Sequence, residues 1–261
     1  AYLQEAMTAF ANAQISQQEL DRLTNQALQE TIAALEQTGS PVITDGEQAK
    51  PSFATYPITG LEGLQPNGVV IPFADGHTRQ LPVISKGPFH YTTTADTYLK
   101  RAKTFTNRPI KQAVIAVSAL SLLYPQDGID GYSQESFLAD LVNEAEKEIR
   151  NCLDAGAYNV QIDFTEGRLA LKLDTSKQLL QAFIDLNNQV LARFSPEEQA
   201  RIGVHSCPGG DHDSTHSADI SYDDLLPALF DLKAGNFYLE YAAEKNKPGV
   251  LAAIKANLKP N

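Results

Sequence analysis

Residues 133–163 read SQESFLADLVNEAEKEIRNCLDAGAYNVQID, and this stretch decides the fold. After Ser133 the apolar side chains recur every three or four residues, which is typical of a helix with one buried face. Ser133 is a favourable capping residue for that helix, and Gly156 ends its pattern. The next strand is expected at 159–163. A helix followed at once by a strand predicts one unit of an α/β protein.

The same alternation continues in both directions along the chain. Helical spacing of apolar residues predicts helices over 16–37, 95–104, 133–157, 179–194, 222–232 and 249–258. Short apolar runs predict five parallel strands at 42–44, 111–117, 159–163, 202–205 and 237–241. Asp75-Gly76 is a turn signal between two apolar runs, and it predicts an inserted β-hairpin near residues 69–85.

Strands that alternate with helices indicate parallel βαβ units within a single domain spanning residues 1–261. Five strands are three fewer than an eight-stranded barrel needs. A doubly wound sheet stays open as an alternative, although the Gly-x-Gly-x-x-Gly phosphate fingerprint does not follow any predicted strand.

Composition excludes several function classes. The chain has 32 acidic and 21 basic residues, a formal net charge of −11, and its basic residues are not gathered as a phosphate-binding surface requires, so nucleic acid is not an expected partner. No run of about 18 apolar residues predicts a membrane span. Two cysteines could form one disulfide at most, and we expect a cytoplasmic protein.

Polar side chains stand where the predicted strands end, at Glu47, Asp163, His205 with Cys207, and Glu240. The carboxyl ends of parallel strands meet at one edge, where functional groups of barrels gather. His205 and Cys207 are two residues apart on an extended backbone and therefore face the same side. An imidazole beside a thiolate suits zinc.

Other candidates near this element have simpler interpretations. Asp211, His212, Asp213 and His216 follow in a polar loop that could support the metal ligands, although a solvated loop is the preferred interpretation of the two histidines. Cys152 lies in the 133–157 helix, where a small buried residue is expected.

Four motifs together resemble the cobalamin-independent methionine synthase family, particularly its short single-barrel members. They are VITDGE at 42–47, VQIDFTEG at 160–167, GVHSCPGGD at 203–211 and NFYLEY at 236–241. The resemblance implies an α/β fold of the (β/α)8 TIM-barrel type, shared with uroporphyrinogen decarboxylase, which here is expected to be truncated at both ends.

The resemblance also implies roles for individual residues of this chain. His205 and Cys207 match two zinc ligands, Glu240 stands where the glutamate ligand is expected with Glu244 as its rival, and a further cysteine ligand has no match after Cys207. Glu47 and Asp163 match acids that hold the amino group of homocysteine.

The resemblance implies a zinc-dependent transfer of a methyl group from 5-methyltetrahydrofolate to homocysteine or a similar thiol, in methionine biosynthesis. Zinc lowers the pKa of the thiol, which then attacks the methyl group as a thiolate. The sequence does not identify the general acid, and without tryptophan any aromatic platform for the donor is Phe or Tyr. A non-catalytic fragment or homologue with a vestigial metal site is the main alternative. A zinc-dependent barrel hydrolase and a porphyrin decarboxylase are weaker ones.

Overall fold

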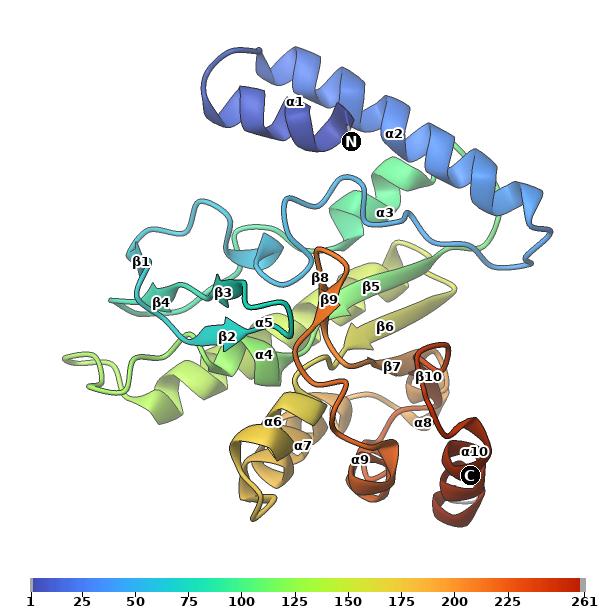
Figure 1. The fold of residues 1–261 in the computed structure, drawn as a ribbon. Coiled ribbons are helices and arrows are strands. Elements are labelled where there is room, and N and C mark those ends of the chain that lie inside the picture. The colour runs from blue at the N-terminus through green and yellow to red at the C-terminus, as the bar shows by residue number, and fades with distance from the viewer. Residues whose placement is uncertain (1, 259–261) are drawn as a thin grey trace. The chain divides into compact units, whose positions relative to one another are not determined.

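The computed structural model describes residues 2–258, and its ribbon is drawn in Figure 1. The chain forms two compact units. The first unit comprises residues 2–59, 92–114 and 148–160, and the second comprises 60–91, 115–147 and 161–258. The chain ends Ala1 and Asn261 lie outside the described residues. The single domain expected over residues 1–261 stays a prediction.

A four-stranded parallel sheet carries the strands expected from the sequence. Its strands are β5 (Lys111–Ile115), β6 (Asn159–Asp163), β7 (Ile202–Ser206) and β10 (Asn236–Leu239). They lie in the order β10-β7-β6-β5, so each strand lies next to the strand of this sheet that precedes it in the chain. Helices connect the strands, as parallel neighbours require. The α/β class with a parallel sheet is therefore confirmed.

The predicted (β/α)8 barrel is only partly realised. The run 42–44 forms one parallel bridge, Ile43 with Ile110, in which the Ile43 amide donates to the Pro109 carbonyl at 3.0 Å. The Lys111 amide donates back to Ile43 at 2.8 Å. Ser40, Pro41 and the turn at Asp45 leave too few extended residues for a full strand. Among residues 2–258 the sheet has four strands and does not close into a barrel.

Short antiparallel ribbons interrupt the α/β pattern. Strands β2 (Val70–Pro72) and β3 (Thr78–Gln80) form the hairpin expected near residues 69–85. Strand β1 (Leu64–Gln65) pairs with β4 (Val83–Ile84) outside it. Gly76 has a φ of +91°, which the tight turn requires and most side chains disfavour. A further hairpin of β8 (Gly210–Asp211) and β9 (Ser214–Thr215) was not expected.

The first unit begins with two helices that pack on each other. They are α1 (Tyr2–Ala11) and α2 (Gln17–Gln37), of which only α2 was predicted. The Ser16 hydroxyl caps α2 by accepting from the Glu19 amide at 3.2 Å. Helix α2 buries Leu28 and Ile32, and the unit also contains the 3-10 helix η1 (Tyr56–Ile58) and α3 (Asp96–Ala102).

Helices surround the strands of the second unit. They are α4 (Val117–Ser121), α6 (Gly167–Leu173), α7 (Gln178–Leu191), α8 (Pro196–Gln199), α9 (Tyr222–Leu229) and α10 (Lys247–Asn257), while α5 (Gln134–Asp154) has residues in both units. Phe164, at the end of β6, is completely buried. A Cβ on Gly167 would lie 2.6 Å from the Phe164 ring, so any larger residue at the start of α6 would require this buried ring to move. No helix within residues 2–258 combines the length and hydropathy that a membrane span needs.

The start of α8 gives a test of local helix capping. The Glu198 amide donates to the Ser195 hydroxyl at 3.3 Å, and the Ser195 amide donates to the Glu198 carboxylate at 2.8 Å. We expect Ser195→Ala to lower the free energy of unfolding by about 1 kcal/mol, because it removes one of these bonds. Urea denaturation measures this. Ser195→Asp keeps a capping oxygen and should stay within a few tenths of a kcal/mol of the parent; an equal loss in both variants would contradict the capping explanation.

Candidate functional site

The candidate site of the second unit lies where β6, β7 and β10 end. Backbone hydrogen bonds continue past the last residues of these strands: the Phe164 amide donates to the His205 carbonyl at 2.9 Å, and the Glu240 amide donates to the Ser206 carbonyl at 3.0 Å. The residues that follow the three strands are therefore held at the same edge of the sheet. Asp163, His205 and Glu240 therefore lie along the same edge of the sheet.

His205 and Cys207 have surroundings that suit metal ligands. The His205 Nδ1 lies 3.1 Å from the Tyr238 carbonyl. Because a carbonyl only accepts, Nδ1 carries the proton, and this hydrogen bond fixes the orientation of the imidazole ring. The Cys207 sulfur accepts from the Gly209 amide at 3.4 Å. Burial raises the pKa of the Cys207 thiol, and the charges of Asp163 and Glu240 raise it further, whereas Arg168 opposes them. The thiol therefore lies within an acidic group of side chains.

Glu240 and Glu244 are distinguished by their partners. The Glu240 Oε1 accepts from the Ala243 amide at 2.9 Å, but its Oε2 is buried and has no hydrogen-bond partner. The Glu244 carboxylate is paired with Arg168, whose Nη2 lies 2.5 Å from its Oε1. Glu240 is thus the glutamate with an oxygen that still needs a cation or a donor.

The donor set fits zinc in kind but not in arrangement. An imidazole, a thiol and a carboxylate are all groups that zinc takes as ligands. The unpartnered Oε2 of Glu240 also fits a carboxylate that completes its bonding on a cation. Within residues 2–258, however, no three His, Cys, Asp or Glu side chains form a ready metal-binding group.

A buried acid that the sequence did not indicate lies beside Asp163. Glu166 is 4 % exposed, and its Oε1 accepts from the Ser118 hydroxyl while its Oε2 has no partner. Asn187 donates to the same hydroxyl at 2.6 Å. Burial raises the pKa of Glu166 to about 7, and the Asp163 charge adds to this effect. Its motif VQIDFTEG showed an acid after a strand, but only the fold shows that the acid is buried.

Glu47 belongs to the first unit and already has a cationic partner there. The Lys50 ammonium donates to the Glu47 carboxylate and to the Ala113 carbonyl, at 2.8 and 2.9 Å, and it lies 4.3 Å from the centre of the Tyr56 ring. Glu47 has a φ of +55°, a backbone conformation that is uncommon for this residue type. Neighbouring Asp45 is 1 % exposed and its Oδ2 has no partner. Burial raises the pKa of Asp45.

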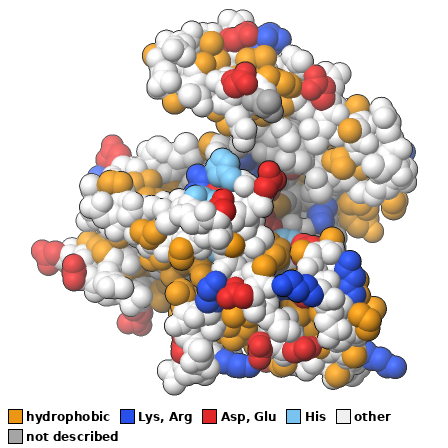
Figure 2. Space-filling view, viewed as in Figure 1, with side chains coloured by type: hydrophobic (Ala, Val, Ile, Leu, Met, Phe, Trp, Pro, Cys, Tyr) orange, Lys and Arg blue, Asp and Glu red, His pale blue; other side chains and the backbone are white. Residues whose placement is uncertain are grey.

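The loop after Cys207 is held by the β2–β3 hairpin. Arg79 donates through Nε and Nη2 to both oxygens of Asp211, and the His77 Nε2 lies 3.1 Å from the same carboxylate. The Phe73 ring packs edge to face on the His216 ring at 5.4 Å. Figure 2 shows histidine, acidic and basic side chains together over β8 and β9.

The two loop histidines differ in exposure. The His212 side chain is 65 % exposed, which agrees with a solvated loop. His216 is only 8 % exposed, so that expectation was wrong for this residue. A Cβ on Gly209 would overlap the His216 ring, because the loop folds back tightly at this glycine. Cys152 is a buried free cysteine, as predicted.

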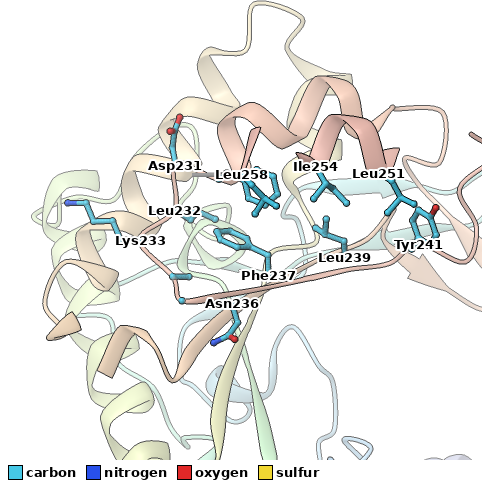
Figure 3. A pocket seen from close by; sticks show the side chains of 13 residues that line it. Asp231, Leu232, Lys233, Asn236, Phe237, Leu239, Tyr241, Leu251, Ile254 and Leu258 are labelled. Carbon is cyan, nitrogen blue, oxygen red and sulfur yellow. The ribbon is translucent and has the colours of Figure 1, made fainter. Parts of the chain in front are cut away.

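A hollow of about 820 Å³ lies between β10, α10 and the segment before β10 (Figure 3). Phe237, Leu239 and Tyr241 line it from alternate positions of the strand, together with Leu251 and Ile254 of the helix. Because successive side chains of a strand point to opposite faces, Glu240 is directed away from this hollow. The hollow is therefore separate from the candidate site.

Comparison with known proteins identifies the fold. No protein-family model matches the chain, and no curated protein matches it in sequence. Among solved structures, a putative vitamin-B12-independent methionine synthase from Listeria monocytogenes is similar, with a TM-score of 0.63 and 20 % identity over 97 % of this chain and 81 % of that one.

A second similar structure is a B12-independent methionine synthase from Shewanella sp. W3-18-1, determined in complex with selenomethionine. Its TM-score is 0.59 at 19 % identity, and the match covers 82 % of this chain and 58 % of that protein. The fold thus resembles that of cobalamin-independent methionine synthases, as the sequence motifs indicated. At this identity the likeness concerns the fold alone.

The raised pKa of Glu166 has a consequence for stability. The folded state binds this proton more tightly than the unfolded chain, so the free energy of unfolding should fall as the pH rises from about 4.5 to about 7 and then level off. Glu148, which is also buried and has a pKa raised to about 7, adds a similar fall. We expect Glu166→Gln to remove about 1 to 3 kcal/mol of this pH dependence.

Urea unfolding at pH 4.5, 6 and 7.5 measures this effect. The variant Glu135→Gln, at an exposed position of α5, is the matched control and should keep the parental pH dependence. An unchanged slope in Glu166→Gln would show that Glu166 keeps its ordinary pKa in the folded protein.

Proposed function

We propose that this chain is a zinc-dependent S-methyltransferase that acts on an amino-acid thiol such as homocysteine. The observation that carries the proposal is the position of Asp163, His205, Cys207 and Glu240 at or just after the carboxyl ends of three adjacent parallel strands, with a buried Glu240 oxygen that has no partner. The methyl donor proposed from the sequence motifs is 5-methyltetrahydrofolate. The Shewanella protein with the similar fold holds selenomethionine, an amino acid of the kind this reaction would produce.

In this proposal His205, Cys207 and Glu240 would hold the zinc ion. Zinc, when bound, supplies a Lewis acid that lowers the pKa of a substrate thiol. The Tyr238 carbonyl keeps the His205 proton on Nδ1 and directs the ring, a hydrogen bond that metal-binding histidines commonly make. The Gly209 amide, which donates to the Cys207 sulfur, favours the charged thiolate over the thiol.

The acids around the site would orient the substrate through its ammonium group. Asp163 is 5 % exposed and accepts from the Gln161 amide group at 2.7 Å, which fixes its carboxylate. Glu47 remains a proposed second partner, and a substrate ammonium would share its carboxylate with Lys50. Opposite charges held at fixed positions in a partly buried site discriminate between amino-acid thiols and simple thiols.

A second candidate function is a non-catalytic protein that keeps a remnant of the metal site. The observation in its favour is that no three donor side chains within residues 2–258 form a ready metal-binding group. Metal content and thiol binding, rather than fold, distinguish the two candidates.

Zinc binding is the first test of the proposal. We expect the purified chain to bind one zinc ion, and Cys207→Ser and Glu240→Gln each to weaken binding by about tenfold or more, since even the loss of a supporting residue costs that much. Competition with a chromogenic chelator measures the affinity. Glu244→Gln is the matched control, because that carboxylate is paired with Arg168. Equal losses of zinc affinity in Glu240→Gln and Glu244→Gln would contradict the assignment of Glu240 as the glutamate ligand.

Substrate binding is the second test. Asp163→Asn should weaken binding of L-homocysteine by about 2 to 5 kcal/mol, because it removes one partner of a desolvated charge pair, and should leave zinc in place. Glu47→Gln should act in the same direction. Isothermal titration calorimetry measures the affinity of both variants for L-homocysteine. The control ligand is 4-sulfanylbutanoic acid, which has no amino group, and its binding should be the same in both variants as in the wild-type chain. Loss of zinc from Asp163→Asn would instead make Asp163 a metal ligand.

A further inference from the structure

Arg168 is an almost completely buried cation with an unused hydrogen-bond donor. The residue is 1 % exposed and lies in the first turn of α6. Its Nη1 donates to the Ile220 carbonyl at 3.0 Å, and its Nη2 donates to Glu244 at 2.5 Å. The guanidinium carbon lies 3.8 Å from the centre of the Tyr222 ring. The Nε has no hydrogen-bond partner, although a buried N–H without one is costly.

The unused donor is on the edge of the guanidinium that suits a carboxylate best. Nε and Nη2 carry parallel N–H bonds, and a carboxylate placed against that edge accepts both with its two oxygens. Glu244 contacts only Nη2 with one oxygen, so it fills half of this edge. Glu244 lies on the turn after β10, where Ala242, Ala243 and Lys245 are exposed.

Arg168 also lies close to the candidate metal ligands. Its charge acts on the Cys207 sulfur, as do the charges of Asp163 and Glu240. The Tyr222 ring below the guanidinium is fixed by its hydroxyl, which donates to the Ser206 carbonyl at 2.9 Å, one residue before Cys207. A cation with an open carboxylate edge, an ammonium-binding acid and a thiol-binding group are thus gathered at the end of β7.

We propose that the Nε–Nη2 edge of Arg168 binds the α-carboxylate of the thiol substrate, which displaces Glu244. The inference rests on the proposed function and adds the residue that recognises the carboxylate of its amino-acid thiol. Exchange of one carboxylate for another leaves the charge of the buried site unchanged. It also gives the Nε a partner, so the incoming carboxylate gains a bond that Glu244 does not make.

The test compares L-homocysteine with 3-aminopropane-1-thiol, which is the same molecule without its carboxylate. Calorimetric titration of the wild-type chain should show that L-homocysteine binds at least about tenfold more tightly than 3-aminopropane-1-thiol. This is the gain in affinity expected from one charged hydrogen-bonded pair. Glu244→Gln removes the competing carboxylate and should tighten L-homocysteine binding by about 3- to 10-fold, with 3-aminopropane-1-thiol unchanged. Glu62→Gln, which removes an exposed carboxylate paired with Lys86, should change neither.

Arg168→Lys keeps the charge but not the paired N–H bonds, and it should weaken only L-homocysteine binding. Circular dichroism checks that each variant is folded, and Glu244→Gln keeps the proposal testable if Arg168→Lys does not fold. Equal affinity of the wild-type chain for the two thiols, unchanged in Glu244→Gln, would overturn the carboxylate site and leave the proposed function standing. Binding of neither thiol would overturn the proposed function, and the carboxylate site with it.

Discussion

Hydrogen bonding between parallel strands is the constraint on which the candidate site depends. The bonds from Phe164 to His205 and from Glu240 to Ser206 lie at or beyond the ends of the strands, so they fix not only the sheet but also the residues that follow it. Side chains that are about 35 to 80 residues apart in the chain are thereby held at one edge. Because the connections between parallel strands are helices on the faces of the sheet, this edge stays open for chemistry.

Charge at this edge is arranged around one buried arginine. In the second unit Asp163 and Glu166 are buried acids, Glu240 and Glu244 are half-buried acids, and Arg168 is a buried cation. Buried charges are tolerated only with partners, and Arg168 has Glu244, the Ile220 carbonyl and the face of Tyr222. Three polar atoms of this group still lack partners, the Arg168 Nε, the Glu166 Oε2 and the Glu240 Oε2. The arginine nitrogen is a hydrogen-bond donor and the glutamate oxygens are acceptors. A small zwitterionic ligand and a cation would supply partners for both kinds of atom.

Hairpins support the loop that carries Cys207. The loop turns back at Gly209, forms β8 and β9, and is held from outside by Arg79 and His77 through Asp211. Both His77 and Arg79 are on the inserted hairpin, more than 130 residues away in the chain. The insertion therefore has a structural role at the site, because its charged hydrogen bonds to Asp211 hold the loop in place.

Local patterns in the sequence determined helices α2 and α5 and the four strands of the parallel sheet. The helix after Ser133 and the strand that follows it depend on neighbours within a few residues, and the sequence was sufficient to predict them. Tertiary structure decided what depends on distant partners: the burial of Glu166 and Arg168, the pairing of Lys50 with Glu47, and the choice of Glu240 over Glu244 as the carboxylate with an oxygen to spare. It also decided that the run 42–44 forms only one bridge and that, within residues 2–258, the sheet does not close. Burial and pairing are properties of side chains brought together by the fold, and no spacing along the chain records them.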